Sequence, residues 1–357
     1  MAITEAQVRE AMARVIEPEL HRDLIALDMV QEIRIDNADV ALTIVLTTPA
    51  CPLKKEIESS ARTELGRIPG IGSVTVNWDA KVPQHRGSGA GKQEVPGVSN
   101  IFAVTSGKGG VGKTTVSVNL AVALAQMGAR VGICDCDIYG PNVPLMMGIS
   151  GTPRAVNNRI VPMSNYDVRI MSMAFLTRED TPLIWRGPMV HSAIRQFLFQ
   201  SEWGELDYLV IDLPPGTGDA QLTLVQAVPL MGGLVVTTPQ DVSLLDAKKA
   251  IMMFRQVNVP VLGIVENMSG FVCPHCGTTS AIFSEGGGSA TAEKYGVPFL
   301  GAVPLELEVR SGSDQGRPIV LREPPSPAGQ ALLEIARRTA AQISVQNLTG
   351  AQLPVIQ

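Results

Sequence analysis

Residues 107–114 have the types and the spacing of a phosphate-binding loop. They read Gly-Lys-Gly-Gly-Val-Gly-Lys-Thr. Glycines let backbone N–H groups turn inward around phosphate oxygens, and a helix that begins at the end of the loop adds the positive end of its dipole. Lys113 is predicted to reach the β- and γ-phosphates of a nucleotide, and the Thr114 hydroxyl to bind Mg²⁺. The other expected contributors to this nucleotide site are Gly107, Lys108, Gly109, Gly110, Val111, Gly112 and Thr115.

Lys108 adds a second cation to this loop, one that has no phosphate role in an ordinary loop of the kind. A fixed cation beside a bound nucleotide can act on the phosphates of a neighbouring subunit, as an arginine finger supplied in trans does. A solvated loop lysine is the alternative. The first interpretation makes Lys108 a catalytic residue.

Two carboxylates follow apolar runs of the sequence. Asp212 comes directly after residues 207–211, at the end of a strand where an aspartate holds Mg²⁺ through water. The glycine- and proline-rich residues 213–219 suit a loop that senses the terminal phosphate and moves when it leaves. Asp137 follows the run 130–134, and two roles are open for it. It orients or deprotonates an attacking water, or it caps a turn.

Cys273 and Cys276 form a Cys-x-x-Cys turn that ends in Gly277. Such a turn presents two thiolates to one metal, and iron–sulfur clusters and zinc both use it. A four-thiolate site needs two more ligands, and the chain has no second Cys-x-x-Cys. Other cysteines can complete the site, or a two-fold axis can supply the same pair twice; we favour the dimer. A redox-active pair and a structural zinc knuckle are the alternatives, with His275 as a turn residue rather than a ligand.

The remaining cysteines carry weaker signals. Cys134 ends an apolar run and is expected to pack in the interior, and for Cys136 packing is favoured over the alternative of a chemical role. Cys51 precedes a helix expected from Leu53, whose dipole would favour a thiolate; packing in the first turn is the other interpretation. In the same region, the carboxylates expected on the surface are Glu19 and Asp28.

Composition is that of a soluble globular protein, with 357 residues, 45% hydrophobic and 18% charged. Residues 1–79 carry the whole net charge of −5, with 8 basic against 13 acidic residues. There is no basic field for nucleic acid, no apolar secretory leader and no apolar run of membrane-spanning length. We therefore expect a cytoplasmic protein that binds neither nucleic acid nor membrane, with its cysteines as thiols or metal ligands.

The elements that must position these residues form two domains. Residues 1–79 predict a small α/β domain, in which helices and strands are expected at 5–17, 33–35, 40–46, 53–65 and 73–78. Residues 80–98 are rich in glycine, proline and polar residues, His85 among them, and predict a flexible linker.

From residue 99 to residue 345 apolar runs alternate with helical patterns. The expected strands are 101–105, 130–134, 168–173, 208–211, 233–237 and 261–266. Continuous runs of this kind predict a mostly parallel sheet covered by helices on both faces. A tail over 346–357 follows.

Several longer motifs together resemble known proteins. The loop from Lys108 to Thr114 resembles the deviant Walker A motif of the MinD, ParA and nitrogenase-iron-protein class. The segments with a closer resemblance, to the Mrp/ApbC iron–sulfur cluster carrier ATPases, are Asp135–Pro141, Trp185–Met189, Asp212–Asp219 and Glu266–Cys276. The resemblance covers about residues 99–340. Residues 1–79 are similar, through Glu17-Pro-Glu19 and Thr47–Pro52, to the small domain of iron–sulfur assembly factors.

This resemblance implies a P-loop ATPase that carries a labile 4Fe–4S cluster, uses ATP and Mg²⁺, and delivers the cluster to apo iron–sulfur proteins. Scaffold proteins and a second copy of the chain would be its partners. By this resemblance, Lys108 would be the signature lysine that acts across the dimer, and Asp137 the switch I carboxylate. Asp212 and Gly216 would belong to switch II, and Asn267 would contact adenine. Cys273 and Cys276 would be the pair that bridges the cluster.

Two other functions remain open. A spatial-positioning ATPase similar to MinD or ParA needs a membrane-binding amphipathic tail or a basic DNA-binding surface, and the ending 346–357 has no basic face. The cysteine pair also has no purpose in such a protein. An electron-transfer ATPase similar to the nitrogenase iron protein would hold its cluster stably and cycle its redox state, which separates it from a carrier.

Overall fold

The computed structural model describes residues 3–18, 20–83, 93–138, 140–176, 187–216, 218, 221–222, 225–226, 228–273 and 275–349. Two compact units divide the chain, residues 1–83 with 340–351, and residues 84–339 with 352–357. The domain limits expected at 79, 98 and 345 stay predictions. Glu19, His85 and most of the expected linker and tail, 84–92 and 350–357, lie outside the described residues.

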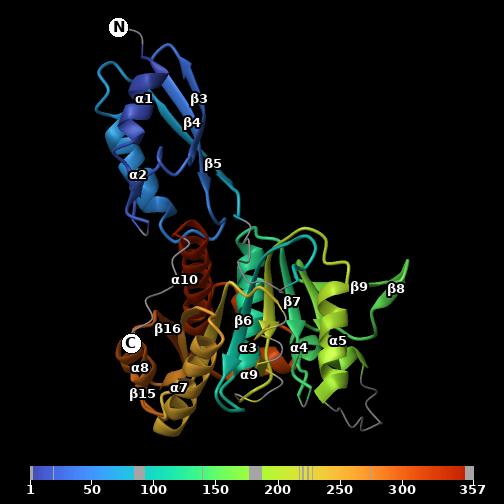
Figure 1. Cartoon of the computed structure of the whole chain (residues 1–357). Helices are drawn as coiled ribbons and strands as arrows, with labels where there is room; N and C mark the ends of the chain where they lie inside the picture. Colours follow the sequence, from blue (N-terminus) through green and yellow to red (C-terminus); the bar gives the residue numbers. More distant parts are fainter. Residues whose placement is uncertain are drawn as a thin grey trace. The chain divides into compact units, whose positions relative to one another are not determined.

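The smaller unit begins with helix α1, Glu5–Met12 (Figure 1). A capping box starts it, because the Thr4 hydroxyl accepts a hydrogen bond from the Gln7 backbone while the Gln7 side chain bonds the Thr4 backbone. The helix predicted over 5–17 is too long. A turn over residues 13–15 follows the helix and leads into strand β1, Ile16–Glu17, which pairs with β2, Arg22–Asp23.

A three-stranded sheet forms the rest of this unit's framework. Strand β3 is Val30–Asp36, β4 is Asp39–Leu46 and β5 is Val74–Ala80. Strand β4 is antiparallel to β3 and parallel to β5, so helix α2, Lys54–Leu65, is the crossover between β4 and β5. The core between helices and sheet includes the fully buried side chains Val8, Leu42, Ile44 and Ile57.

The last helix of the chain, α10, runs from Pro327 to Thr349, and its final turns belong to the smaller unit. The Ser344 hydroxyl hydrogen-bonds the Thr47 hydroxyl, and the Asn347 amide donates to the Pro83 carbonyl at 3.2 Å. The C-terminal segment therefore completes a domain that the first eighty residues begin.

A mixed, mostly parallel sheet is the centre of the larger unit. Its order in the described residues is β10-β11-β7-β12-β6-β13-β14-β15, with β16 paired to β14 as well. The strands β10 and β15 are antiparallel to their neighbours, and the others are parallel. In sheet order the bounds are Met163–Asn165, Val168–Ser172, Val131–Asp135, Leu206–Asp212, Val98–Ser106, Gly232–Thr237, Val261–Val272 and Thr279–Ser280, and β16 is Phe299–Leu305.

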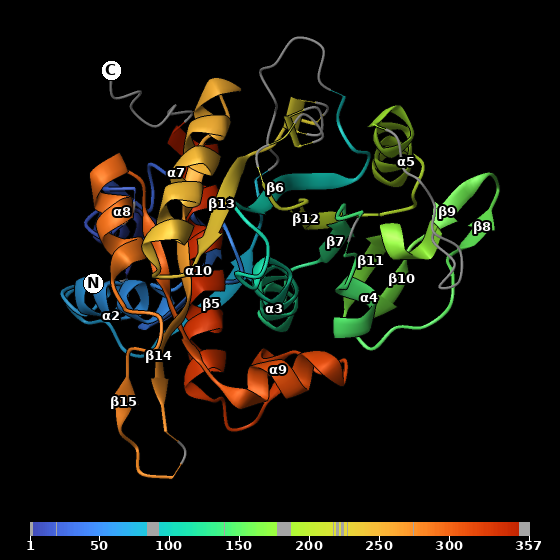
Figure 2. The same cartoon turned by 90° about the horizontal axis from the view of Figure 1, so that it is seen from below.

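Helices cover both faces of this sheet, with α3 and α4 on one face and α5 and α7 on the other (Figure 2). The described helices are α3 Lys113–Gln126, α4 Val143–Met146, α5 Gly187–Phe199, α7 Asp241–Gln256, α8 Gly287–Tyr295 and α9 Leu307–Asp314, with short 3-10 turns at Met173–Leu176 and Ile319–Leu321. A separate hairpin joins β8, Arg154–Val156, to β9, Arg159–Val161. The predicted fold class is confirmed.

Parallel strands bring their carboxyl ends to one edge of the sheet, and this places the polar residues expected there side by side. Asp212 ends β12 and is in register with Asp135, which ends β7. On its other side β12 pairs with β6, which ends at Ser106 before the glycine-rich loop. No helix in the described residues is long and apolar enough to cross a membrane.

Candidate functional site

The glycine-rich loop joins β6 to α3, as its sequence requires. Two of its glycines have no room for a side chain. A Cβ on Gly107 would lie 2.2 Å from the backbone carbonyl of Asp246 in α7, and a Cβ on Gly112 would lie 2.2 Å from the Nδ2 of Asn267. Gly112 also has a φ of +79°, which favours glycine. The loop therefore depends on glycine both for its turn and for its close contacts.

A cavity of about 420 Å³ opens beside this loop, within the volume range of nucleotide and other small-molecule sites. The loop and the start of α3 line one side of it through Gly109, Gly110, Lys113, Thr114 and Thr115. The loop after β7, the short helix α4 and the end of α9 supply other lining residues, namely Asp137, Gly140, Asn142, Leu145, Met146, Ser313 and Asp314.

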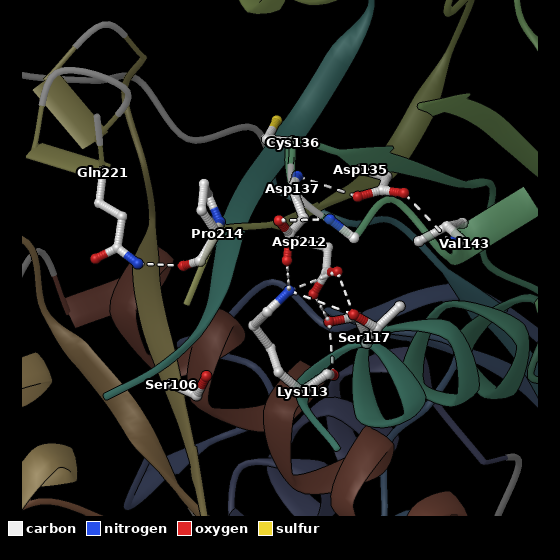
Figure 3. Close-up of polar contacts among 12 residues, drawn as sticks. Ser106, Lys113, Ser117, Asp135, Cys136, Asp137, Val143, Asp212, Pro214 and Gln221 are labelled. Carbon is white, nitrogen blue, oxygen red and sulfur yellow. Dashed lines mark hydrogen bonds and ion pairs between the residues drawn. The ribbon is translucent and has the colours of Figure 1, made fainter. Parts of the chain in front are cut away.

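Lys113 lies at the centre of a buried polar network (Figure 3). Its Nζ is 2.7 Å from Oδ2 of Asp212 and 4.0 Å from Oδ2 of Asp137. The Thr114 hydroxyl donates to Asp212 Oδ2 at 2.8 Å, and the Ser117 hydroxyl donates to Asp212 Oδ1 at 2.6 Å. The predicted phosphate lysine, the predicted Mg²⁺ hydroxyl and the predicted Mg²⁺ carboxylate are thus in direct contact.

Asp135 organises the loop that carries Asp137. Its carboxylate accepts hydrogen bonds from the Ser172 hydroxyl at 2.8 Å and from the backbone N–H groups of Asp137 and Val143 at 3.1 and 3.3 Å. Burial, and after it the negative charge of Asp212, raises the pKa of Asp135 to about 7. Asp135 thus faces the centre of the loop rather than the cavity.

Asp137 lines the cavity and also accepts the Gly140 N–H at 3.3 Å. Both roles considered for it fit this position, because a carboxylate that closes a turn can still reach a bound phosphate with its other oxygen. Its contact with Lys113 favours the role near the phosphates.

Three further predicted residues lie around the loop. The Asn267 side chain, expected to contact adenine, donates to the Val111 carbonyl at 2.8 Å and so supports the loop from behind. Gly216 donates its N–H to the Ser106 carbonyl at 2.9 Å, which ties the start of the switch II segment to the end of β6. Lys108 is half-buried, and its carbonyl accepts the Ser106 hydroxyl at 2.9 Å. The roles predicted for these three residues remain predictions.

The glycine- and proline-rich residues that follow Asp212, expected to form switch II, are described only in part. Residues 217, 219 and 220 lie outside the described residues. Gln221 lies next to this segment, and its side-chain amide donates to the Pro214 carbonyl, as Figure 3 shows. Its Oε1 is buried and has no hydrogen-bond partner among the described residues.

The cysteine pair lies at the tip of the β14–β15 hairpin, which extends away from the sheet (Figure 2). The Cys273 carbonyl accepts the Gly277 N–H at 2.9 Å, and the Cys273 N–H donates to the Thr278 carbonyl at 3.0 Å. These bonds close a tight turn that carries both cysteines. Cys276 and His275 are exposed and Cys273 is half-buried.

The Thr278 hydroxyl, with further bonds from the Thr278 backbone and the Cys273 thiol, lowers the pKa of Cys276. No third histidine, cysteine or carboxylate completes a metal site with this pair within the described ranges. One chain thus offers two sulfur ligands, which fits half of a four-thiolate site.

The other cysteines have the surroundings that packing residues have. Cys134 and Cys136 are buried with their sulfurs 3.7 Å apart. The hydrogen bond with Cys134, and then burial, raises the pKa of Cys136. Cys51 is half-buried and lies just before α2.

Asp28, in the same unit as Cys51, has a positive backbone φ of 55°.

Sequence reasoning missed two polar residues of the network. Ser117 lies one turn after Thr114 in an otherwise apolar part of α3, and that isolated hydroxyl was a usable signal. Ser172 ends β11 and gave no local signal, because only the sheet order brings it beside Asp135.

These elements define a P-loop NTPase: a parallel sheet with the loop, the lysine and the strand-end aspartate at one edge. The chain belongs to the family of NUBPL iron-transfer P-loop NTPases, whose model matches residues 97–340. A second model, for iron–sulfur cluster assembly proteins, matches residues 5–78.

Relatives similar over nearly the whole chain are iron–sulfur cluster carrier proteins. One from Synechocystis is 48% identical over 97% of this chain and 99% of its own. One from Deinococcus radiodurans is 49% identical over 97% and 98%. An iron–sulfur cluster transfer protein NUBPL from Dictyostelium discoideum is 46% identical over 75% and 85%. The predicted family is confirmed, so the chain is a member of the iron–sulfur cluster carrier and transfer proteins.

Solved structures support the fold. A nucleotide-binding protein from Archaeoglobus fulgidus in complex with ADP is 40% identical, with a TM-score of 0.57 over 63% of this chain and 89% of that chain. The cell-division ATPase MinD from Pyrococcus furiosus has a TM-score of 0.51 over 67% of this chain and 97% of that chain, and at 23% identity it supports the fold alone.

Proposed function

We propose that this protein is an ATP-hydrolysing homodimer that holds a labile 4Fe–4S cluster between its two subunits and passes it to apo-proteins. The observation that carries the proposal is the isolated cysteine pair. Two sulfurs lie at the tip of a hairpin, and the described residues supply no third ligand. A two-fold axis turns two ligands into four, which is the number that a 4Fe–4S cluster takes.

The nucleotide site is proposed to act as follows. The Lys113 ammonium, now on Asp212, binds the phosphates of ATP, and the Thr114 hydroxyl holds Mg²⁺ with Asp212 through water; the metal neutralises phosphate charge. Asp137 orients the attacking water from the loop that Asp135 positions. Lys108 reaches the nucleotide of the partner subunit.

ATP can change cluster affinity only through a difference in its own affinity for two arrangements of the dimer. The bond from the Asn267 amide to the Val111 carbonyl ties the phosphate loop to β14, the strand that leads into the cysteine hairpin. We propose that this contact passes the change to the cysteine hairpin. The recipients are apo iron–sulfur proteins, the donors are scaffold proteins, and the site of action is the cytoplasm.

Anaerobic reconstitution tests the shared cluster. Wild-type chain should take up about four iron and four sulfide per dimer, with the absorption of a 4Fe–4S cluster. Cys273→Ala and Cys276→Ala should each lose the cluster, whereas the control Cys51→Ala, a half-buried cysteine of the smaller unit, should retain it. A complete cluster on a monomer, or one retained by Cys276→Ala, contradicts the proposal.

A mixed dimer tests the roles of Lys108 and Asp137 together. Homodimers of Lys108→Ala and of Asp137→Asn should both lose ATP hydrolysis while keeping nucleotide binding. When the two variants are mixed, the pocket of the Lys108→Ala chain keeps its own Asp137 and receives Lys108 from the partner, so hydrolysis should return. Failure to recover activity in a mixture that forms heterodimers would exclude a lysine acting across the interface.

A further inference from the structure

Thr278 makes the surroundings of the two cysteine sulfurs unequal. Its Oγ1 lies 3.3 Å from Sγ of Cys276. The Cys276 thiol donates to this oxygen, and in the thiolate form of Cys276 the Thr278 hydroxyl is the donor in the same contact. Cys273 is instead held through its backbone, by the bonds to Thr278 and Gly277. Thr278 therefore places its hydroxyl against the sulfur of Cys276 and its backbone carbonyl against the N–H of Cys273.

The hairpin fixes Thr278 in this place. The strand pairing of Phe271 with Ser280 and of Val272 with Thr279 continues one step further, because the Cys273 N–H donates to the Thr278 carbonyl. Thr278 thus lies opposite Cys273 while its side chain reaches Cys276. Its backbone closes the turn and its hydroxyl serves the sulfur, so the two roles can be separated by substitution.

We propose that Thr278 is a positioning residue of the metal site, whose hydroxyl donates to the Cys276 thiolate and makes Cys276 the more tightly held of the two ligands. Cys273 is then the ligand that leaves the metal first. Hydrogen bonds to a thiolate spread its charge and fix the direction of its lone pairs, which is how groups beyond the ligands tune a metal site. The cargo rests on the function proposed above, but the contact applies to any thiolate-binding metal.

Cobalt(II) binding by the full-length apo-protein tests the positioning role without a cluster. The readout is the thiolate-to-cobalt charge-transfer band during titration. Thr278→Val keeps the shape of the side chain and removes the donor, so it should weaken Co²⁺ binding about tenfold. Thr278→Ser keeps the donor and should bind as wild type does. The control Thr279→Val changes an exposed neighbour on β15 and should also bind as wild type does.

The inequality of the ligands has its own test. Cys273→Ser should retain Co²⁺ better than Cys276→Ser, and Thr278→Val should abolish this difference. Equal affinity in the two serine variants, wild-type affinity in Thr278→Val, or an equal loss in Thr279→Val would overturn the inference. If the cobalt results hold while reconstitution yields no 4Fe–4S cluster, the cluster-carrier proposal fails and the role of Thr278 stands.

Discussion

The structure predicts two separate effects of the substitution Lys113→Met, a loss of stability and a loss of ATP binding. In the nucleotide-free protein the Lys113 ammonium lies 2.7 Å from an Asp212 oxygen, and the two side chains are 6% and 0% exposed. Methionine keeps most of the buried length and removes the charge. The Asp212 carboxylate is then left with the hydroxyls of Thr114 and Ser117 as its donors, in a site that also holds Asp135.

The magnitude follows from the burial of the pair. Removal of one partner of a buried ion pair costs about 3–5 kcal/mol, because the other charge stays buried without compensation. At about 2–4 °C per kcal/mol for a unit of this size, Tm should fall by about 6–20 °C. Lys249→Met is the matched control. Its pair with Asp246 is equally short at 2.8 Å but 66% exposed at the lysine, so it should cost about 0–1 kcal/mol.

Calorimetry with and without Mg–ATP separates the structural role of Lys113 from its binding role. At a hundredfold excess over Kd, a ligand stabilises the folded state by about 2.7 kcal/mol. Wild type and Lys249→Met should show the corresponding rise in Tm, and Lys113→Met should show none. A Lys113→Met protein as stable as Lys249→Met, or one that ATP stabilises as it does wild type, would refute this account of the buried network.

Two other predictions concern pH and the loop. Because the pKa of Asp135 is raised from 3.8 to about 7, the folded state holds a proton between those values that the unfolded state has released. Stability should therefore fall as pH rises through this window, and urea midpoints of Asp135→Asn should fall less steeply with pH than those of wild type. Gly112→Ala should abolish ATP binding in calorimetric titration, since its φ of +79° and the Asn267 amide 2.2 Å from the new Cβ force the loop to move. Normal affinity in Gly112→Ala would show that the loop tolerates a shift.

The residues of the candidate nucleotide site could be predicted from the sequence because they are adjacent in the chain or end strands that are neighbours in the sheet. The motif fixes Lys113 and Thr114, and an apolar run before Asp212 places that carboxylate at the same sheet edge. Parallel pairing then brings the groups together without further information. Ser172 could not be placed in this way, because its contact depends on β11 lying beside β7.

Elements outside the continuous apolar runs were harder to predict. Strand β14 was expected to end at Glu266 but continues to Val272, because pairing with β15 and β16 outweighs the break in the apolar run after Glu266. Strand β16 was not expected, since Gly301 and Pro304 interrupt its pattern. Helix α1 ends at Met12 because tertiary pairing of Ile16 and Glu17 outweighs the local helical pattern.

The position of Cys273 and Cys276 in the loop of a hairpin has a consequence for engineering. Between Val272, where β14 ends, and Thr279, where β15 begins, the described residues belong to no strand, so this loop can be exchanged as a unit. Loops with other spacings or other soft donors can be spliced between these two residues while the phosphate-binding machinery keeps its sequence. The cysteine loop can in this way be varied separately from the glycine-rich loop at residues 107–114, which lies elsewhere in the sequence.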